Sequence, residues 1–230
     1  MAGIQGGKRE VVSICAVDFL TGDVLVNSLV KPRQAILDWR SNITGITPAT
    51  MSIAVARNIT LDSWEAARAE LQKHIDENTI LVGQSINFDL KALRVKHGRV
   101  IDSAILTAEA VFGRNNPIRR RWGLADLCQD LLGLRIRKDT GLHDPLEDVL
   151  AAREVVLRCL RRPAELERWA RKSRRLFGEE RNKPKVVHEL RWEDYCTSDH
   201  DDLLSADEIL RWEDVIDYDV WPRSPLDWDY

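Results

Sequence analysis

The stretch His143-Asp144-Pro145-Leu146-Glu147-Asp148 indicates the start of a helix. Asp144 is a residue type that caps helices, and Pro145 suits the first helical position. Glu147 stands where a capping box places its acid. These signals predict a helix that runs from Pro145 to about Leu160.

The inward face of this helix begins with an acid. Asp148 shares one face with Ala152, Val155 and Cys159 at helical spacing. A carboxylate that heads an apolar face must be paired, protonated or bound to a cation, because an unpaired buried charge is costly. His143 lies five residues ahead of it. The stretch therefore indicates half of a metal-dependent active site.

The chain before this helix alternates between strand and helix signals. Glu10 to Phe19 and Asp23 to Leu29 read as a β-hairpin, and a loop through Thr47-Pro48 follows. A helix is then predicted from Asp62 to Asp76, capped by Thr60 or Asp62. Short strands at Thr79 to Gly83 and Val100 to Asp102 and helices at Asp89 to Val95, Ser103 to Val111 and Gly123 to Leu132 complete the series.

This order predicts an α/β domain with a mixed sheet, flanked by helices, whose last strands are parallel. The apolar run Thr79 to Gly83 is typical of a strand buried on both faces. In open sheets the ligand crevice lies beyond the carboxyl ends of the strands. Asp89 follows the first of these short strands, where it is either a helix cap or a ligand. Asp102 ends the second and is interpreted as structural.

Composition and charge limit the function classes. No apolar run approaches the roughly 20 residues of a membrane helix, and the start shows no signal peptide, so an intracellular protein without a membrane partner is expected. The four cysteines form no Cys-x-x-Cys pair, which disfavours a zinc site or a disulfide framework. The net charge of −3 combines −11 in residues 189–230 with +8 in residues 1–188, and a basic body suits nucleic acid.

Two segments carry the resemblance to a known family. Gly83-Gln84-Ser85-Ile86-Asn87-Phe88-Asp89-Leu90-Lys91-Ala92-Leu93 and the pair His143 and Asp148 are similar to the second and third motifs of the DEDDh 3′-to-5′ exonucleases. The similarity covers Met1 to about Leu160 and is strongest to the eukaryotic RNA exonuclease branch. It implies a ribonuclease H-like fold. Gln84 departs from the histidine that this branch often has.

The larger departure from the family lies at the start of the sequence. The family's first motif, Asp-x-Glu on a central strand, has no counterpart before Met1-Ala2-Gly3. We therefore expect an N-terminally truncated chain that lacks this strand. The expected domains are residues 1–162 (exonuclease), 163–188 (basic helical extension) and 189–230 (acidic, Trp-containing, disordered tail). An Asp-x-Asp at Asp217 and Asp219 is a remote candidate to replace the missing acids.

The resemblance implies the roles of the site residues. Asp89 and Asp148 would bind Mg²⁺ or Mn²⁺, two ions in a complete site, and His143 would be the general base for phosphodiester hydrolysis. Because the first-motif acids are absent, we expect this chain to be weakly active or inactive. The alternative is a catalytically dead exonuclease-fold module that binds RNA or protein.

The expected partner is single-stranded nucleic acid, with RNA favoured by the resemblance. Phe88 would stack on a base or pack in the core, and Asn87 lies beside it. Arg119-Arg120-Arg121 would hold phosphates or form a solvated loop. The tail repeats Leu-Arg-Trp-Glu-Asp at Leu190 and Leu210, which indicates a linker, a protein-partner motif or an autoinhibitory segment. A nuclear or nucleolar location is expected from the basic clusters and the family.

Overall fold

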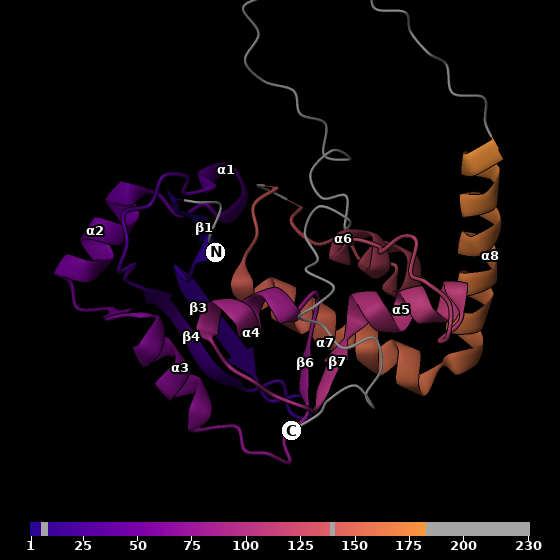
Figure 1. The fold of residues 1–230 in the computed structure, drawn as a ribbon, viewed down its shortest axis with the longest axis horizontal. Coiled ribbons are helices and arrows are strands. Elements are labelled where there is room, and N and C mark those ends of the chain that lie inside the picture. The colour runs from indigo at the N-terminus through magenta and orange to yellow at the C-terminus, as the bar shows by residue number, and fades with distance from the viewer. Residues whose placement is uncertain (6–8, 139–140, 183–230) are drawn as a thin grey trace, which may run out of the picture. The chain divides into compact units, whose positions relative to one another are not determined.

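The computed structural model describes residues 1–5, 9–138 and 141–182 (Figure 1). The acidic tail, with its repeat and its Asp-x-Asp, lies outside the described residues, as do residues 183–188 of the expected basic extension. None of the described helices combines the length and apolarity needed to cross a membrane.

The described strands form three short sheets. β1 (Ala2–Gly3) pairs antiparallel with β2 (Arg9–Glu10). β3 (Ser13–Val17) and β4 (Val24–Val30) form the predicted hairpin, and β5 (Thr60–Leu61) adds to β4 in parallel. β6 (Leu81–Gly83) and β7 (Val100–Asp102) pair in parallel, as predicted. Among the described strands, none pairs with both β3 and β6, so the mixed α/β arrangement is divided rather than continuous.

Eight helices follow the chain order in the described residues. They are α1 (Ser41–Thr44), α2 (Pro48–Ala56), α3 (Trp64–Gln72), α4 (Asn87–Leu93), α5 (Ser103–Phe112), α6 (Leu124–Leu127), α7 (Pro145–Arg161) and α8 (Pro163–Asn182). A π-helical turn, Cys128–Leu132, continues α6. The helix predicted from Gly123 to Leu132 is therefore one segment of two kinds of turn.

Three predictions for the segment between residues 47 and 83 were wrong. The segment around Thr47-Pro48 is not a loop but the start of α2, where Thr47 and Thr50 form a capping box. α3 is capped by Ser63 rather than by Thr60 or Asp62, because Ser63 Oγ accepts a hydrogen bond from Ala66 N. The strand near Thr79 is only partly buried, since Ile80 is 53% exposed. Among the described strands, β6 pairs only with β7, so its side chains are less shielded from solvent than those of a central strand would be.

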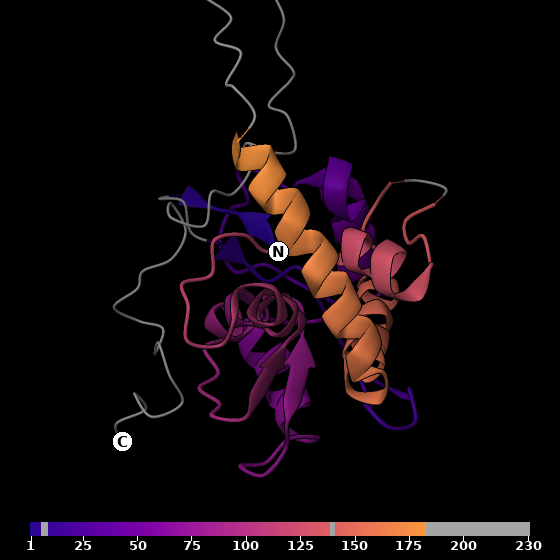
Figure 2. The same ribbon diagram turned by 90° about the vertical axis from the view of Figure 1, so that its right-hand side faces the viewer.

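α7 connects the two larger sheets through its packing. It contacts both β3 and β6, and its buried residues include Ala152, Val155 and Cys159, which confirms the predicted inward face (Figure 1). α8, a single uninterrupted helix in Figure 2, places Trp169 and Ala170 in the same core cluster. The cluster also holds Trp122, with Ala108 and Val111 of α5 and Leu124 and Leu127 of α6. This packing fixes the N-terminal end of α7, where His143 and Asp148 lie.

Candidate active site

The first turn of α7 is organised by Asp144. Its Oδ1 accepts hydrogen bonds from Leu146 N at 2.8 Å and Glu147 N at 3.4 Å, and Pro145 occupies the first turn, as predicted. Glu147 does not close a capping box. Its Oε2 instead accepts a hydrogen bond from Arg137 N at 3.0 Å. The Glu147 carboxylate therefore binds the backbone of the preceding segment instead of the N-cap backbone of α7.

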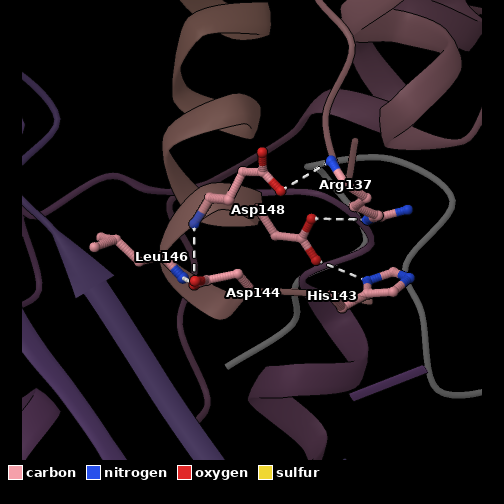
Figure 3. A network of polar contacts seen from close by, with 6 residues as sticks. Arg137, His143, Asp144, Leu146 and Asp148 are labelled. Atoms are coloured by element: carbon pink, nitrogen blue, oxygen red, sulfur yellow. Dashed lines mark hydrogen bonds and ion pairs between the residues drawn. The ribbon is translucent and has the colours of Figure 1, made fainter. Parts of the chain in front are cut away.

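Asp148 lies between two cationic or potentially cationic side chains (Figure 3). Its Oδ2 accepts a hydrogen bond from His143 Nδ1 at 2.7 Å. Its Oδ1 accepts from Arg137 Nη2 at 2.8 Å and from Arg137 Nε at 3.3 Å. The predicted inward acid is therefore paired. Burial alone would raise the pKa of Asp148, but the hydrogen bonds from His143 and Arg137 outweigh it and hold the pKa below its usual value.

His143 is oriented at two points. Its backbone N donates to Ile43 O at 2.7 Å, which ties the residue to α1. Its Nδ1 faces the Asp148 carboxylate, so in the neutral ring Nδ1 carries the proton and Nε2, which has no hydrogen-bond partner among the described residues, is the acceptor. An imidazole oriented by a carboxylate in this way can take a proton from a water molecule.

Arg137 is the residue of this network that the sequence analysis missed. It lies between the π-helical turn and α7, in a left-handed backbone conformation with φ of 59°. Its side chain is 19% exposed and forms an ion pair with Asp148. No periodicity links the two residues, because Arg137 belongs to an irregular segment eleven residues earlier. The sequence offered only the general expectation that an inward acid needs a cationic partner.

Asp89 occupies a second charged environment, in the first turn of α4. Its side chain keeps an exposed surface, yet the surrounding protein shields the carboxyl from much of the solvent, and this burial raises the pKa of Asp89 to about 6. The positive charges of the Met1 amino group and Arg9 lower the pKa, and Asp102 raises it. Asp89 is not the helix cap, which is Ile86.

Asp102 is structural, as predicted. Its Oδ1 accepts hydrogen bonds from Ser85 N and Ala104 N, each at 2.9 Å, and its Oδ2 accepts from Ile86 N at 3.1 Å. These bonds join the end of β7 to the turn before α4, where Ser85 has φ of 52°. Asp102 thereby fixes the turn that leads into α4, whose first helical turn carries Asp89. Burial raises the pKa of Asp102, although its backbone donors oppose the shift.

The predicted nucleic-acid contacts are distributed over two segments. The Arg9 guanidinium lies 4.7 Å from the centre of the Phe88 ring, and Phe88 is half-buried. Asn87 Oδ1 is buried and has no hydrogen-bond partner among the described residues. In the second segment, Arg119 is exposed and Arg120 lies over the Trp122 ring at 5.7 Å.

Two further side chains of these segments support the fold around Asp102. Arg121 lies close enough to Asp102 to lower its pKa. Gln84, the departure from the family motif, donates from Nε2 to Trp122 O at 3.0 Å. Ser103 Oγ lies 2.5 Å from Gln84 Oε1. Gln84 therefore connects β6 with the segment before α6.

The carboxylates do not fit a pair of divalent ions in this arrangement. Within residues 1–5, 9–138 and 141–182, no three His, Cys, Asp or Glu side chains gather as a metal site. Both oxygens of Asp148 are engaged by His143 and Arg137, and those of Asp102 by backbone amides. Asp89 and Asp148 remain the only predicted ligands, and a positive side chain already neutralises the second.

The comparisons with known proteins agree with this fold. Residues 1–156 match the family described as exonuclease. The chain belongs to the exonuclease family. This exonuclease domain is 36% identical over 162 residues to the small RNA degrading nuclease 2 of Arabidopsis thaliana and 33% identical over 147 residues to RNA exonuclease 3 of Candida albicans. The aligned parts cover 70% and 64% of this chain, and only 33% of each relative, so the chain spans about a third of their length.

Solved structures support the fold of the exonuclease domain. The Neurospora crassa Pan2 catalytic unit has a TM-score of 0.54 at 20% identity, covering 76% of this chain and 27% of that one. The Saccharomyces cerevisiae Pan2 pseudoubiquitin hydrolase–RNA exonuclease module in complex with AAGGAA RNA has a TM-score of 0.60 at 20% identity, covering 77% and 29%. At this level of identity the likeness concerns the fold.

Replacing Asp89 with asparagine is expected to stabilise the domain at neutral pH and to change it little near pH 4. The folded-state pKa of about 6 lies above the ordinary value of 3.8, so the folded state disfavours the charged carboxylate. Wild-type stability therefore falls, relative to Asp89→Asn, as pH rises through 6. Urea unfolding of both proteins without divalent ions, from about pH 4 to about pH 7.5, measures this difference. A difference that is constant across this range contradicts the assignment.

Proposed function

We propose that this exonuclease domain binds the 3′ end of single-stranded RNA through the surface that carries Asp89, His143 and Asp148, and that hydrolysis by this chain is weak or absent. RNA is favoured because the relatives are named as RNA exonucleases and small RNA degrading nucleases. A Pan2 module of similar fold is described in complex with RNA.

The observation that carries the proposal is the hydrogen bond between His143 Nδ1 and Asp148 Oδ2 at 2.7 Å. It joins the two residues of the predicted third motif in the arrangement of a general base and the carboxylate that orients it. The general-base role assigned to His143 rests on Nε2, which this bond leaves as the acceptor nitrogen of the neutral ring. A histidine on an unrelated surface would have no reason to be oriented by an inward acid.

Weak hydrolysis follows from the ligand set. In a complete site, Mg²⁺ or Mn²⁺ would activate the water and neutralise the leaving oxygen. The described residues offer Asp89 and Asp148 for this purpose, and Asp148 already pairs with Arg137. The second candidate function, an inactive exonuclease-fold module that binds RNA or protein, gains support from this pairing. Protein binding through the acidic tail and a nuclear or nucleolar location stay proposals.

Binding and trimming of one labelled RNA test both parts of the proposal. A 5′-fluorescein single-stranded RNA is titrated with the 230-residue chain in EDTA, and anisotropy is recorded at about 50 mM and about 200 mM salt. We expect binding that weakens as salt rises. No binding at low salt overturns the RNA proposal.

The same RNA, incubated with MgCl₂ or MnCl₂ and resolved on a gel, reports hydrolysis and its direction. We expect little or no shortening. Progressive loss from the 3′ end that disappears in Asp148→Ala would show an active nuclease and contradict the weak-hydrolysis part. Shortening that persists in Asp148→Ala indicates a contaminant, and a repurified sample then gives the outcome. Single-stranded DNA of the same sequence tests the preference for RNA.

Arg9→Ala is expected to weaken RNA binding and to reduce its salt dependence. Arg9 contacts the Phe88 ring, and its positive charge lowers the pKa of Asp89. This charge therefore lies beside the predicted binding residues. Loss of one phosphate contact lowers the slope of log affinity against log salt by about 0.7 for a single strand. Anisotropy titrations at several salt concentrations measure the slope. Arg57→Ala, at the exposed C-terminal end of α2, is the matched control and should leave the slope unchanged.

A further inference from the structure

Arg137 is held at two points by the first turn of α7. Its backbone N donates to Glu147 Oε2 at 3.0 Å, and its guanidinium donates to Asp148 Oδ1 through Nη2 at 2.8 Å and Nε at 3.3 Å. Both acids belong to the same turn of helix. The side chain is 19% exposed, and that of Asp148 is 24% exposed, so the pair is shielded from solvent. This clamp is stronger than a surface ion pair between two mobile side chains.

The guanidinium and a divalent ion would require the same space. Mg²⁺ binds carboxylate oxygens at about 2.0–2.1 Å and Ca²⁺ at about 2.3–2.6 Å, on the lone-pair side of the oxygen. Asp148 Oδ1 accepts from two nitrogens of Arg137, which occupy its lone-pair side, and Oδ2 accepts one hydrogen bond from His143, so an ion on Asp148 would have to lie beside the guanidinium. An ion approaching Oδ1 would also meet a positive charge at close range, where repulsion in a partly shielded site is strong.

We propose that Arg137 is a built-in counter-cation of Asp148, which excludes divalent ions from this carboxylate until the arginine leaves it. The inference deepens the proposed function, because it names one residue that weakens metal binding in addition to the absence of the first-motif acids. It rests on the assignment of Asp148 to the site. It does not depend on RNA binding, which is measured separately in EDTA.

Titration with MnCl₂ of the full 230-residue chain tests the proposal, with isothermal calorimetry as the readout and no RNA present. Arg137→Gln removes the charge and keeps a shorter side chain with an amide hydrogen-bond donor. We expect Arg137→Gln to bind Mn²⁺ about tenfold more tightly than wild type, since removing a shielded ion-pair partner leaves a carboxylate that needs a cation. The double variant Arg137→Gln, Asp148→Asn should lose this gain.

Two further variants separate competition from a merely structural role. Arg135→Gln removes an exposed arginine from the same segment and should bind Mn²⁺ as wild type does. Arg137→Lys keeps the positive charge but cannot form the two-pronged contact, so its affinity should lie between those of wild type and Arg137→Gln. Thermal unfolding without metal shows which variants are folded. If Arg137→Gln is not folded, the Mn²⁺ affinity of Arg137→Lys is compared with that of wild type instead.

The outcomes are distinct for this inference and for the proposed function. Equal Mn²⁺ affinity in wild type and Arg137→Gln overturns the counter-cation role, and so does a gain that survives Asp148→Asn. When Arg137→Lys is the folded variant, affinity equal to that of wild type overturns it. If the wild-type chain does not bind RNA at low salt, the proposed function is overturned and the Mn²⁺ result remains valid.

Discussion

Trp169→Ala is expected to lower the free energy of unfolding by about 3–5 kcal/mol, the range for removing a large aromatic side chain from a core. Trp169 is 8% exposed and stands edge-on to the Trp122 ring, with 5.2 Å between ring centres. Its Nε1 also donates to Asp130 Oδ2 at 3.0 Å. The substitution therefore removes packing, a ring contact and a hydrogen bond together. Urea unfolding followed by circular dichroism measures the loss.

Two control variants of α8 locate the effect. Trp169→Phe keeps an aromatic ring but loses the hydrogen bond, so a smaller loss of about 1–2 kcal/mol is expected. Leu176→Ala changes an apolar residue of the same helix that is 42% exposed, and it should cost much less than Trp169→Ala. If Trp169→Ala costs no more than Leu176→Ala, α8 is not part of the cooperative core.

Asp102→Ala is expected to destabilise the domain by about 3–5 kcal/mol. Asp102 is 5% exposed, and its carboxylate accepts hydrogen bonds from three backbone N–H groups, those of Ser85, Ile86 and Ala104. Alanine leaves these donors without their acceptor, and each unsatisfied buried group costs about 1–3 kcal/mol. Because some donors would reach water after local rearrangement, the total is less than the sum of the three.

Graded substitutions test the Asp102 assignment. Asp102→Asn keeps one acceptor oxygen and should cost about half as much as Asp102→Ala. Glu77→Ala changes an exposed acid between α3 and β6 and should be close to neutral. Chemical denaturation at neutral pH compares the variants. Equal stability of Asp102→Ala and wild type would show that these hydrogen bonds do not hold the turn before α4.

The local features of α7 were predictable from the sequence. An aspartate cap, a proline in the first turn and an apolar face at helical spacing are short-range signals, and the structure confirms each of them. The β3–β4 hairpin and the parallel pair β6–β7 were likewise predicted from short apolar runs and the turns between them. α2 was missed although Thr47 and Pro48 carry the same kind of signal as Asp144 and Pro145.

The site was predictable in its residue types and only partly in its contacts. His143 and Asp148 lie five residues apart, so the helix start brings them together almost by geometry alone. Asp89 was predicted at a strand's carboxyl end, but its pKa is raised by burial and by Asp102 and lowered by Arg9, and these two residues come from distant parts of the chain. Charge effects of this kind depend on distances that only the folded chain fixes.

The sequence by itself determined the α/β class, the exonuclease family motifs and the orientation of Asp148 toward the core, because periodicity and capping act within a few residues. Only the tertiary structure decided that Arg137 pairs with Asp148, that the described strands fall into three sheets, and that Trp169 of α8 enters the core. Each of these contacts joins segments whose local patterns are independent of one another. Their partners are selected by packing and charge after the chain has folded.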